Sequence, residues 1–138
     1  MVIDEGAREW DDYWGSIHEA AHAVVARHFG YPVPKLTMTY ARIPHPRYDA
    51  PDDPDSIKRL LVSCAGNAAT LAFLGYTKTG TQDDLMSLKR LRGLGAGFQL
   101  QRRLLRGARE LAHELVLALR KEIYAVAKAL RRDRKSVV

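Results

Sequence analysis

Two histidines one helical turn apart restrict the fold of this chain more than any other feature. His18 and His22 lie in residues 17–29, a run of Ala- and Val-rich sequence that contains no Gly or Pro. Residues four apart share one face of a helix, so both imidazoles would point at one place. Ser16 before the run and Gly30 after it are typical start and stop residues, and they predict a helix from Ser16 to about residue 29.

Glu19 completes the pattern H-E-x-x-H, which is typical of zinc peptidases when it lies on a helix. Its carboxylate would stand beside the metal, near enough to take a proton from the zinc-bound water. Zinc lowers the pKa of water from ~15.7 to about 7 and polarises a carbonyl, so Glu19 would act as the general base of amide hydrolysis. The competing explanation is a capping box of Ser16 and Glu19 on a helix that carries an exposed His pair.

A catalytic zinc ion usually has three protein ligands and a water molecule. His28 follows His22 at the spacing of the metzincin third histidine, but Val25 stands where that motif needs a glycine for a turn. On a continuous helix His28 lies about 240° round from His22, so we expect a partly exposed structural histidine. Spacing alone leaves five candidates open: Asp83, Asp84, Glu110, Glu114 and Glu122.

The remaining sequence predicts a mainly α (α+β) fold with a short β segment after the metal-binding helix. Residues 35–40 alternate polar and apolar and predict a strand, and the proline-rich residues 41–54 predict an irregular connection. Later helices are expected from Pro54, capped by Asp53, to about Gly75, over residues 81–91, and from Phe98 or Gly107 to Arg132. Helical spacing predicts that they bury Leu60, Leu61, Cys64, Ala68, Leu71 and Ala72, and then Leu111, Leu115, Leu119, Ile123, Val126 and Leu130.

Size and composition predict one domain over residues 1–138, with an N-terminal extension at 1–15 and a basic tail at 133–138. Trp10 and Trp14 are spaced to share a helical face that docks the extension on the body. The longest uncharged stretch, residues 60–77, is short and contains polar residues, so no membrane span is expected. The acidic start and the single cysteine, Cys64, favour a cytoplasmic protein in which Cys64 is a small buried residue.

Charge is distributed unevenly along the chain. Residues 1–75 have 7 Lys/Arg against 10 Asp/Glu, a net −3, whereas residues 76–138 have 15 against 6, a net +9. A basic surface attracts nucleic acid, acidic partners or membranes. These charges fall mainly on predicted helices as solvated faces, so we do not expect nucleic-acid binding.

Four ordered segments resemble the peptidase domain of the FtsH family, the membrane-bound AAA proteases. Residues 18–26 (H-E-A-A-H-A-V-V-A) are similar to the family's H-E-A-G-H-A-V-V-A, and residues 32–38 to its P-V-x-K-V-T-I strand. Residues 65–69 (A-G-N-A-A) are similar to its A-G-R-A-A-E helix, and residues 79–85 (T-G-T-Q-D-D-L) to T-G-A-S-N-D-L. With the closing helix, the resemblance covers about residues 17–132.

The resemblance implies that Asp84 is the third zinc ligand beside His18 and His22, although Thr81 and Asp84 also form a capping-box pattern. Three support positions depart from the family: Ala21 replaces a glycine, Asn67 an arginine and Thr70 a glutamate. The resemblance also implies a homo-oligomer, a hexamer if it forms a ring.

The chain contains no G-x-x-x-x-G-K-[ST] phosphate loop, and Gly93, Gly95 and Gly97 fit no nucleotide pattern, so no ATP-driven motor is expected. The sequence therefore predicts an ATP-independent zinc metalloendopeptidase that cleaves unfolded or exposed segments of a protein or peptide. Two alternatives stay open. One is a non-catalytic zinc-binding regulatory or nucleic-acid-binding protein, and the other is a protease subunit that works with a separate ATPase.

Overall fold

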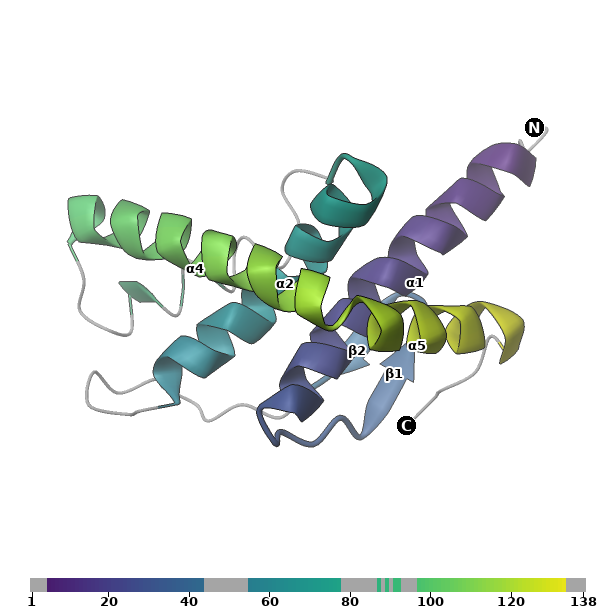
Figure 1. Ribbon diagram of the computed structural model, residues 1–138, viewed down its shortest axis with the longest axis horizontal. Coiled ribbons are helices and arrows are strands. Elements are labelled where there is room, and N and C mark those ends of the chain that lie inside the picture. The colour runs from purple at the N-terminus through teal and green to yellow at the C-terminus, as the bar shows by residue number, and fades with distance from the viewer. Residues whose placement is uncertain are drawn as a thin grey trace.

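A computed structural model describes residues 5–43, 55–77, 87, 89, 91–92 and 97–133 (Figure 1). The long elements are the helices α1 (Glu5–His28), α2 (Ser56–Leu74), α4 (Phe98–Ala118) and α5 (Arg120–Asp133). Two short strands, β1 (Lys35–Thr37) and β2 (Tyr40–Arg42), follow α1. The prediction of a mainly helical fold with a short β segment after the first helix is confirmed.

Helix α1 begins at Glu5, so the predicted start at Ser16 is wrong. Ser16 is buried inside the helix, where its hydroxyl donates to the Tyr13 carbonyl (2.8 Å) and accepts from Arg131 Nη1 (2.7 Å). A polar residue that favours helix starts is tolerated here because α5 supplies its partner. The predicted stop is confirmed, since α1 ends at His28 and Gly30 has a φ of +84°.

The β segment is a hairpin rather than the single predicted strand. β1 and β2 pair antiparallel with Thr37 opposite Tyr40, so the chain reverses at Met38 and the next residue. Leu36 is buried, but Tyr40, which the alternation would place on the same face of a single strand, is 51% exposed because the turn carries it off the apolar face. The turn lies against α1 at Gly15, where an added Cβ would stand 2.8 Å from the Met38 carbonyl oxygen. A glycine in the middle of α1 therefore lets the hairpin approach it closely.

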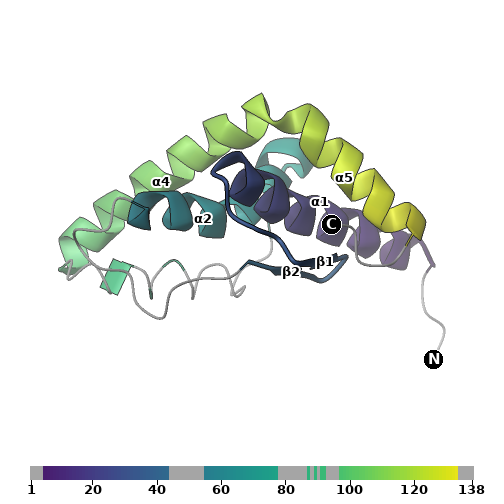
Figure 2. The ribbon, with the colours of Figure 1, turned by 90° about the horizontal axis from the view of Figure 1, so that it is seen from below.

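The helices form two layers. α1 and α2 pack against each other, while α4 lies along α2 and α5 along α1 (Figure 2). The predicted continuous last helix is wrong, because the helix is broken at Leu119, where the chain bends from α2 toward α1. The core between the layers consists of small and branched side chains from all four helices, among them Ile17, Val25, Leu60, Ala65, Ala69, Ala112, Val116, Ile123, Ala127 and Leu130.

Helix α2 is covered on two sides, by α1 and by α4. It begins after Asp55 and ends at Gly75, whose φ is +83° and whose N–H donates to the Leu71 carbonyl; the predicted cap Asp53 and first residue Pro54 lie outside the described residues. Leu60, Cys64 and Ala68 are buried as predicted, but Leu71 is 53% exposed, and so is Leu111 of α4 at 57%. Leu71 is exposed because two neighbours, rather than one, decide which face of α2 is covered. Leu111 is exposed because α4 buries the face with Ala108, Ala112 and Val116 instead.

Among the described residues, α2 is long and apolar enough to cross a membrane by length and composition. More than half of its apolar stretch is buried inside the protein, and the core helix of a soluble protein passes the same test. Packing between α1 and α4 accounts for its composition.

Candidate metal centre

The imidazoles of His18 and His22 converge on one point beside α2. Their Nε2 atoms are 3.3 Å apart and their rings meet edge to face, with centroids 4.9 Å apart. The two residues are only 5% and 7% exposed. Helical spacing along α1 thus brings the two nitrogens together in a site largely closed to water.

The tautomer of His22 follows from its contact with α2. His22 Nδ1 lies 2.7 Å from the backbone carbonyl oxygen of Val62, which can only accept a hydrogen bond. The proton of a neutral His22 ring is therefore on Nδ1, and Nε2 presents its lone pair toward His18. Backbone carbonyls orient metal-binding histidines in this way in many proteins.

Gly66 of α2 leaves the space in front of both rings open. A Cβ atom added there would stand 2.5 Å from His22 Nε2 and 2.8 Å from His18 Nε2. Any larger residue would fill the space that the two nitrogens face. Helices α1 and α2 therefore cross at a point where the absence of one side chain creates a cradle.

Trp14, one turn before His18, fixes the plane of its ring. The two rings stack with centroids 4.7 Å apart and an angle of 18° between their planes, and Trp14 is buried. The prediction that both tryptophans dock the N-terminal segment is confirmed for Trp14. Trp10 remains partly exposed and stacks on Tyr13 and Tyr76.

The pair fits two ligands of a tetrahedral zinc ion. Nitrogens bound at about 2.0–2.1 Å with a tetrahedral angle between them lie ~3.3 Å apart, which is the separation of the two Nε2 atoms. The open cradle at Gly66 and the carbonyl partner of His22 agree with this use. The same separation suits one N–H···N hydrogen bond between the two rings when no metal is bound.

The structure places the other predicted residues as follows. Glu19 is half-buried beside the pair, whereas His28 is exposed at the end of α1 against the Phe29 ring, as predicted. The alternative ligands Glu110, Glu114 and Glu122 are exposed on α4 and α5 and do not join the histidines. Asp83 and Asp84 lie outside the described residues. Within the part of the chain that is described, no group of three His, Cys, Asp or Glu side chains gathers around a possible metal position.

The two support positions of α2 that depart from the FtsH pattern have partners of their own. Thr70 is fully buried and its hydroxyl lies 3.1 Å from that of Thr77, which donates to Asn67 Oδ1 at 2.9 Å. This short network ties the chain beyond α2 back onto the helix. Asn67 and Thr70 therefore hold the end of α2 without the Arg and Glu of the family pattern.

Sequence reasoning missed the roles of Val62, Gly66 and Trp14. The small residues Ala65, Gly66, Ala68 and Ala69 of α2 allow close approach by a neighbour, but the sequence does not show that the neighbour is the His pair. The aromatic spacing of Trp14 and His18, four apart on α1, was a usable signal for their stacking. Comparison with known proteins finds no family model and no curated protein that matches the chain.

Proposed function

We propose that the protein is a zinc metallopeptidase in which His18 and His22 hold the metal and Glu19 is the general base. The observation that carries the proposal is the buried His pair, with its Nε2 atoms 3.3 Å apart and His22 oriented by the Val62 carbonyl. A buried pair of this kind argues against the alternative of an exposed His pair on a surface helix. The helical scaffold is then a zinc-peptidase domain similar to that of the FtsH family.

Asp84 remains our proposed third ligand, on the strength of the resemblance. Among the described residues, Ser87, three residues later in the sequence, is buried, and its hydroxyl lies 3.7 Å from Cys64 Sγ of α2.

Each residue of the proposed site then has a defined task. A zinc ion bound there would polarise a peptide carbonyl and lower the pKa of an attacking water molecule. Val62 keeps a proton on His22 Nδ1, and Trp14 keeps the His18 ring in its plane. The Glu19 carboxylate accepts a proton from the attacking water and transfers it to the leaving amine nitrogen. Glu19 is the least buried of the three motif residues, so its carboxylate is accessible to both the attacking water and the leaving amine.

The substrate we propose is an unfolded or exposed segment, cleaved without ATP. The hairpin turn contacts α1 at Gly15, about one turn before His18, and both β1 and β2 pack on α1. An extended peptide could pair with an outer strand of this hairpin and present its backbone to Glu19. In a variant of this proposal, a separate ATPase unfolds the substrate and delivers such segments to this peptidase.

The test is hydrolysis of an unfolded, fluorescently labelled protein by zinc-loaded wild type and Glu19→Gln. General-base catalysis contributes about 10²–10⁴-fold, and we expect the variant to lose that factor while it retains zinc. Glu122→Gln, a matched change at an exposed position on α5, should cleave at the wild-type rate.

Two results would count against the proposal. Equal rates for wild type and Glu19→Gln would remove Glu19 from the mechanism. Retention of zinc without cleavage of any unfolded substrate would favour a non-catalytic zinc-binding protein instead.

A further inference from the structure

The outward face of α4 carries a stripe of six residues at heptad spacing, which we call the α4 stripe. Spacings of three and four alternate along it without interruption: Leu100, Arg103, Gly107, Glu110, Glu114 and Leu117. Five of the six are exposed and Gly107 is half-buried. Positions repeated in this way form one continuous seam on a helix, as in coiled coils.

Nothing within the described chain covers the α4 stripe. The opposite face of α4, with Ala108, Ala112 and Val116, is the one buried against α2. Among the described residues, no ion pair engages Arg103, Glu110 or Glu114. Leu100 and Leu117, at the two ends of the stripe, are 51% and 40% exposed. Two exposed leucines, one at each end of the row of charges, are thus available for contact with a partner.

The α4 stripe is complementary to itself only when two copies run antiparallel. A two-fold axis between residues 108 and 109 places Leu100 opposite Leu117 and Arg103 opposite Glu114 of the second copy. Gly107 then faces Glu110 at the centre, where the lack of a side chain lets the helices approach. A parallel pairing would instead set each charge against its own kind, which disfavours it.

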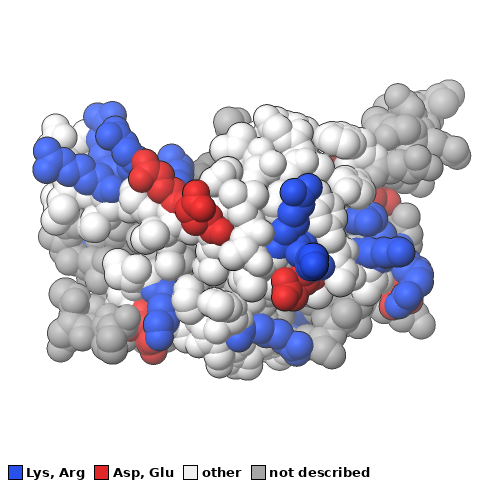
Figure 3. Space-filling model, in the orientation of Figure 1, with Lys and Arg blue, Asp and Glu red and all other residues white. Residues whose placement is uncertain are grey.

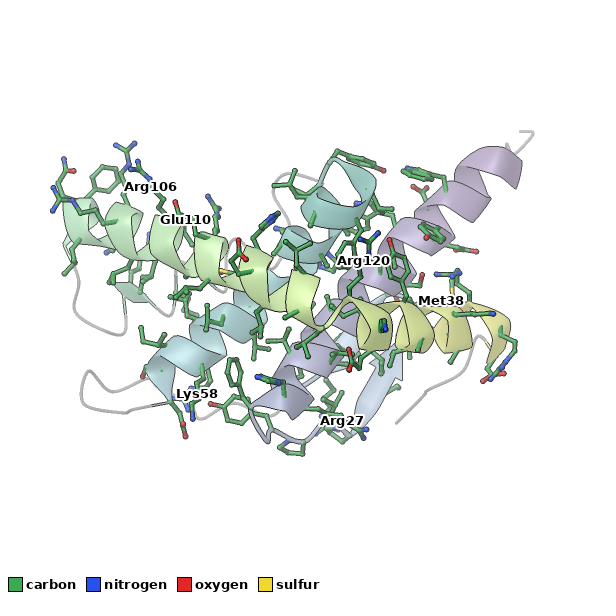
Figure 4. All side chains as sticks on the ribbon, viewed as in Figure 1. Arg27, Met38, Lys58, Arg106, Glu110 and Arg120 are labelled. Carbon is green, nitrogen blue, oxygen red and sulfur yellow. The ribbon has the colours of Figure 1, made fainter. Side chains whose placement is uncertain are left out.

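The charge pattern along the helix supports this choice of partner. Figure 3 shows basic groups at the N-terminal end of α4 and acidic groups beside them further along the helix. Arg106 and Glu110 lie along the same side of α4 (Figure 4), so Arg106 adds a second basic group opposite Glu110 of an antiparallel copy. The glutamates in the middle of the stripe would repel a nucleic acid or an anionic membrane.

We propose that two copies of this chain associate through an antiparallel, two-fold contact between their α4 stripes. A contact made by one helix from each copy is small compared with a standard protein interface, so the dimer is weak and reversible. Its orientation comes from four Arg–Glu pairs and its contact area from the two Leu pairs. The proposal does not depend on the metal centre.

The test uses charge-reversed variants in sedimentation velocity at low salt over a wide range of protein concentration. Arg103→Glu with Arg106→Glu leaves only acidic groups on the stripe and at the adjoining position 106, and Glu110→Arg with Glu114→Arg leaves only basic groups there. We expect at least about a hundredfold weaker self-association for each variant alone. An equimolar mixture of the two should form a heterodimer at least as tight as the wild-type dimer, because every pair is again complementary.

Far-UV circular dichroism and thermal melts of both variants check that the fold is intact, since all four positions are exposed. A wild type that stays monomeric at the highest concentration would overturn the proposal. So would variants that dimerise as well as wild type, or a mixture that fails to restore association.

Discussion

The close approach of α2 to the His pair makes Gly66→Ala the most informative single substitution. The added Cβ would lie 2.5 Å from His22 Nε2 and 2.7 Å from His18 Cε1, roughly 1 Å inside the ~3.5 Å separation at which non-bonded atoms attract. Both rings are buried and His22 is held by Val62, so neither can move without losing a contact. The helices must separate, or a ring must leave its position.

Two effects determine the change in unfolding free energy that we expect for Gly66→Ala. Overpacking of a closed core costs about 1–3 kcal/mol, and the better helix propensity of alanine returns about 1 kcal/mol. Gly107→Ala is a matched control for the helix-propensity effect, because Gly107 also lies inside a helix and its added Cβ meets nothing within 4 Å. Relative to that control, Gly66→Ala should lose about 1–3 kcal/mol, or roughly 3–10 °C in Tm.

Metal binding separates this effect from simple destabilisation. Displacement of a ligand or of its support typically weakens metal affinity by about 10–100-fold, and we expect a loss of this size for zinc in Gly66→Ala. Gly15→Ala is the second control, because its Cβ clashes with the Met38 carbonyl and not with the histidines; it should lose stability and retain zinc. The melts belong at low protein concentration, where α4 pairing contributes nothing.

The reasoning fails if Gly66→Ala is as stable as Gly107→Ala and binds zinc like wild type. In that case α2 does not cross α1 at the His pair as described. Loss of zinc affinity in Gly15→Ala as well would mean that affinity follows overall stability, not the local clash.

Two further predictions concern the side chains that hold α1 in place. Arg131→Met should cost about 1–2 kcal/mol in denaturant unfolding, because it removes the hydrogen bond to Ser16 and the cation–π contact with Tyr13 of α1. The control Arg132→Met, at an exposed ion pair, should change stability by less than ~0.5 kcal/mol. Equal losses in the two variants would contradict this assignment. In Trp10→Phe, where Trp14 is the remaining tryptophan, zinc binding should change the tryptophan fluorescence because the Trp14 indole stacks on His18. An unchanged spectrum at saturating zinc would place the metal elsewhere.

The local parts of the fold were predictable from the sequence. Helical spacing placed His18 and His22 on one face of α1, and Gly30 marked the end of that helix. These features depend on residues within one or two turns of each other, where periodicity and capping preferences act directly. The burial of Leu60, Cys64 and Ala68 in α2 follows from the same periodicity.

The errors arose where a distant segment overrides a local preference. Ser16 is a good helix start, yet α1 continues through it because Arg131 of α5 binds its hydroxyl. A continuous last helix would satisfy the apolar spacing, but the helix is interrupted at Leu119. The interruption lets α4 pack on α2 while α5 packs on α1. Local patterns carry no information about these tertiary contacts.

The candidate site divides in the same way. The motif named His18, Glu19 and His22, all within one turn and a half of α1, whereas the Val62 carbonyl is forty residues from the ring that it orients. Gly66 has meaning only when α2 is placed across α1. Supporting contacts of a metal centre come from whichever element happens to pack on it, so a motif predicts the ligands better than their surroundings.

The central claim is that the His pair binds zinc, and a zinc titration tests it most directly. Equilibrium dialysis of metal-free wild type, Glu19→Gln and His22→Gln would count bound zinc per chain. The account predicts one zinc per chain for wild type and Glu19→Gln, and binding weakened by at least about 100-fold for His22→Gln, since removal of a ligand costs more than removal of its support. Wild type that binds no zinc, or His22→Gln that binds it as tightly as wild type, would contradict the account.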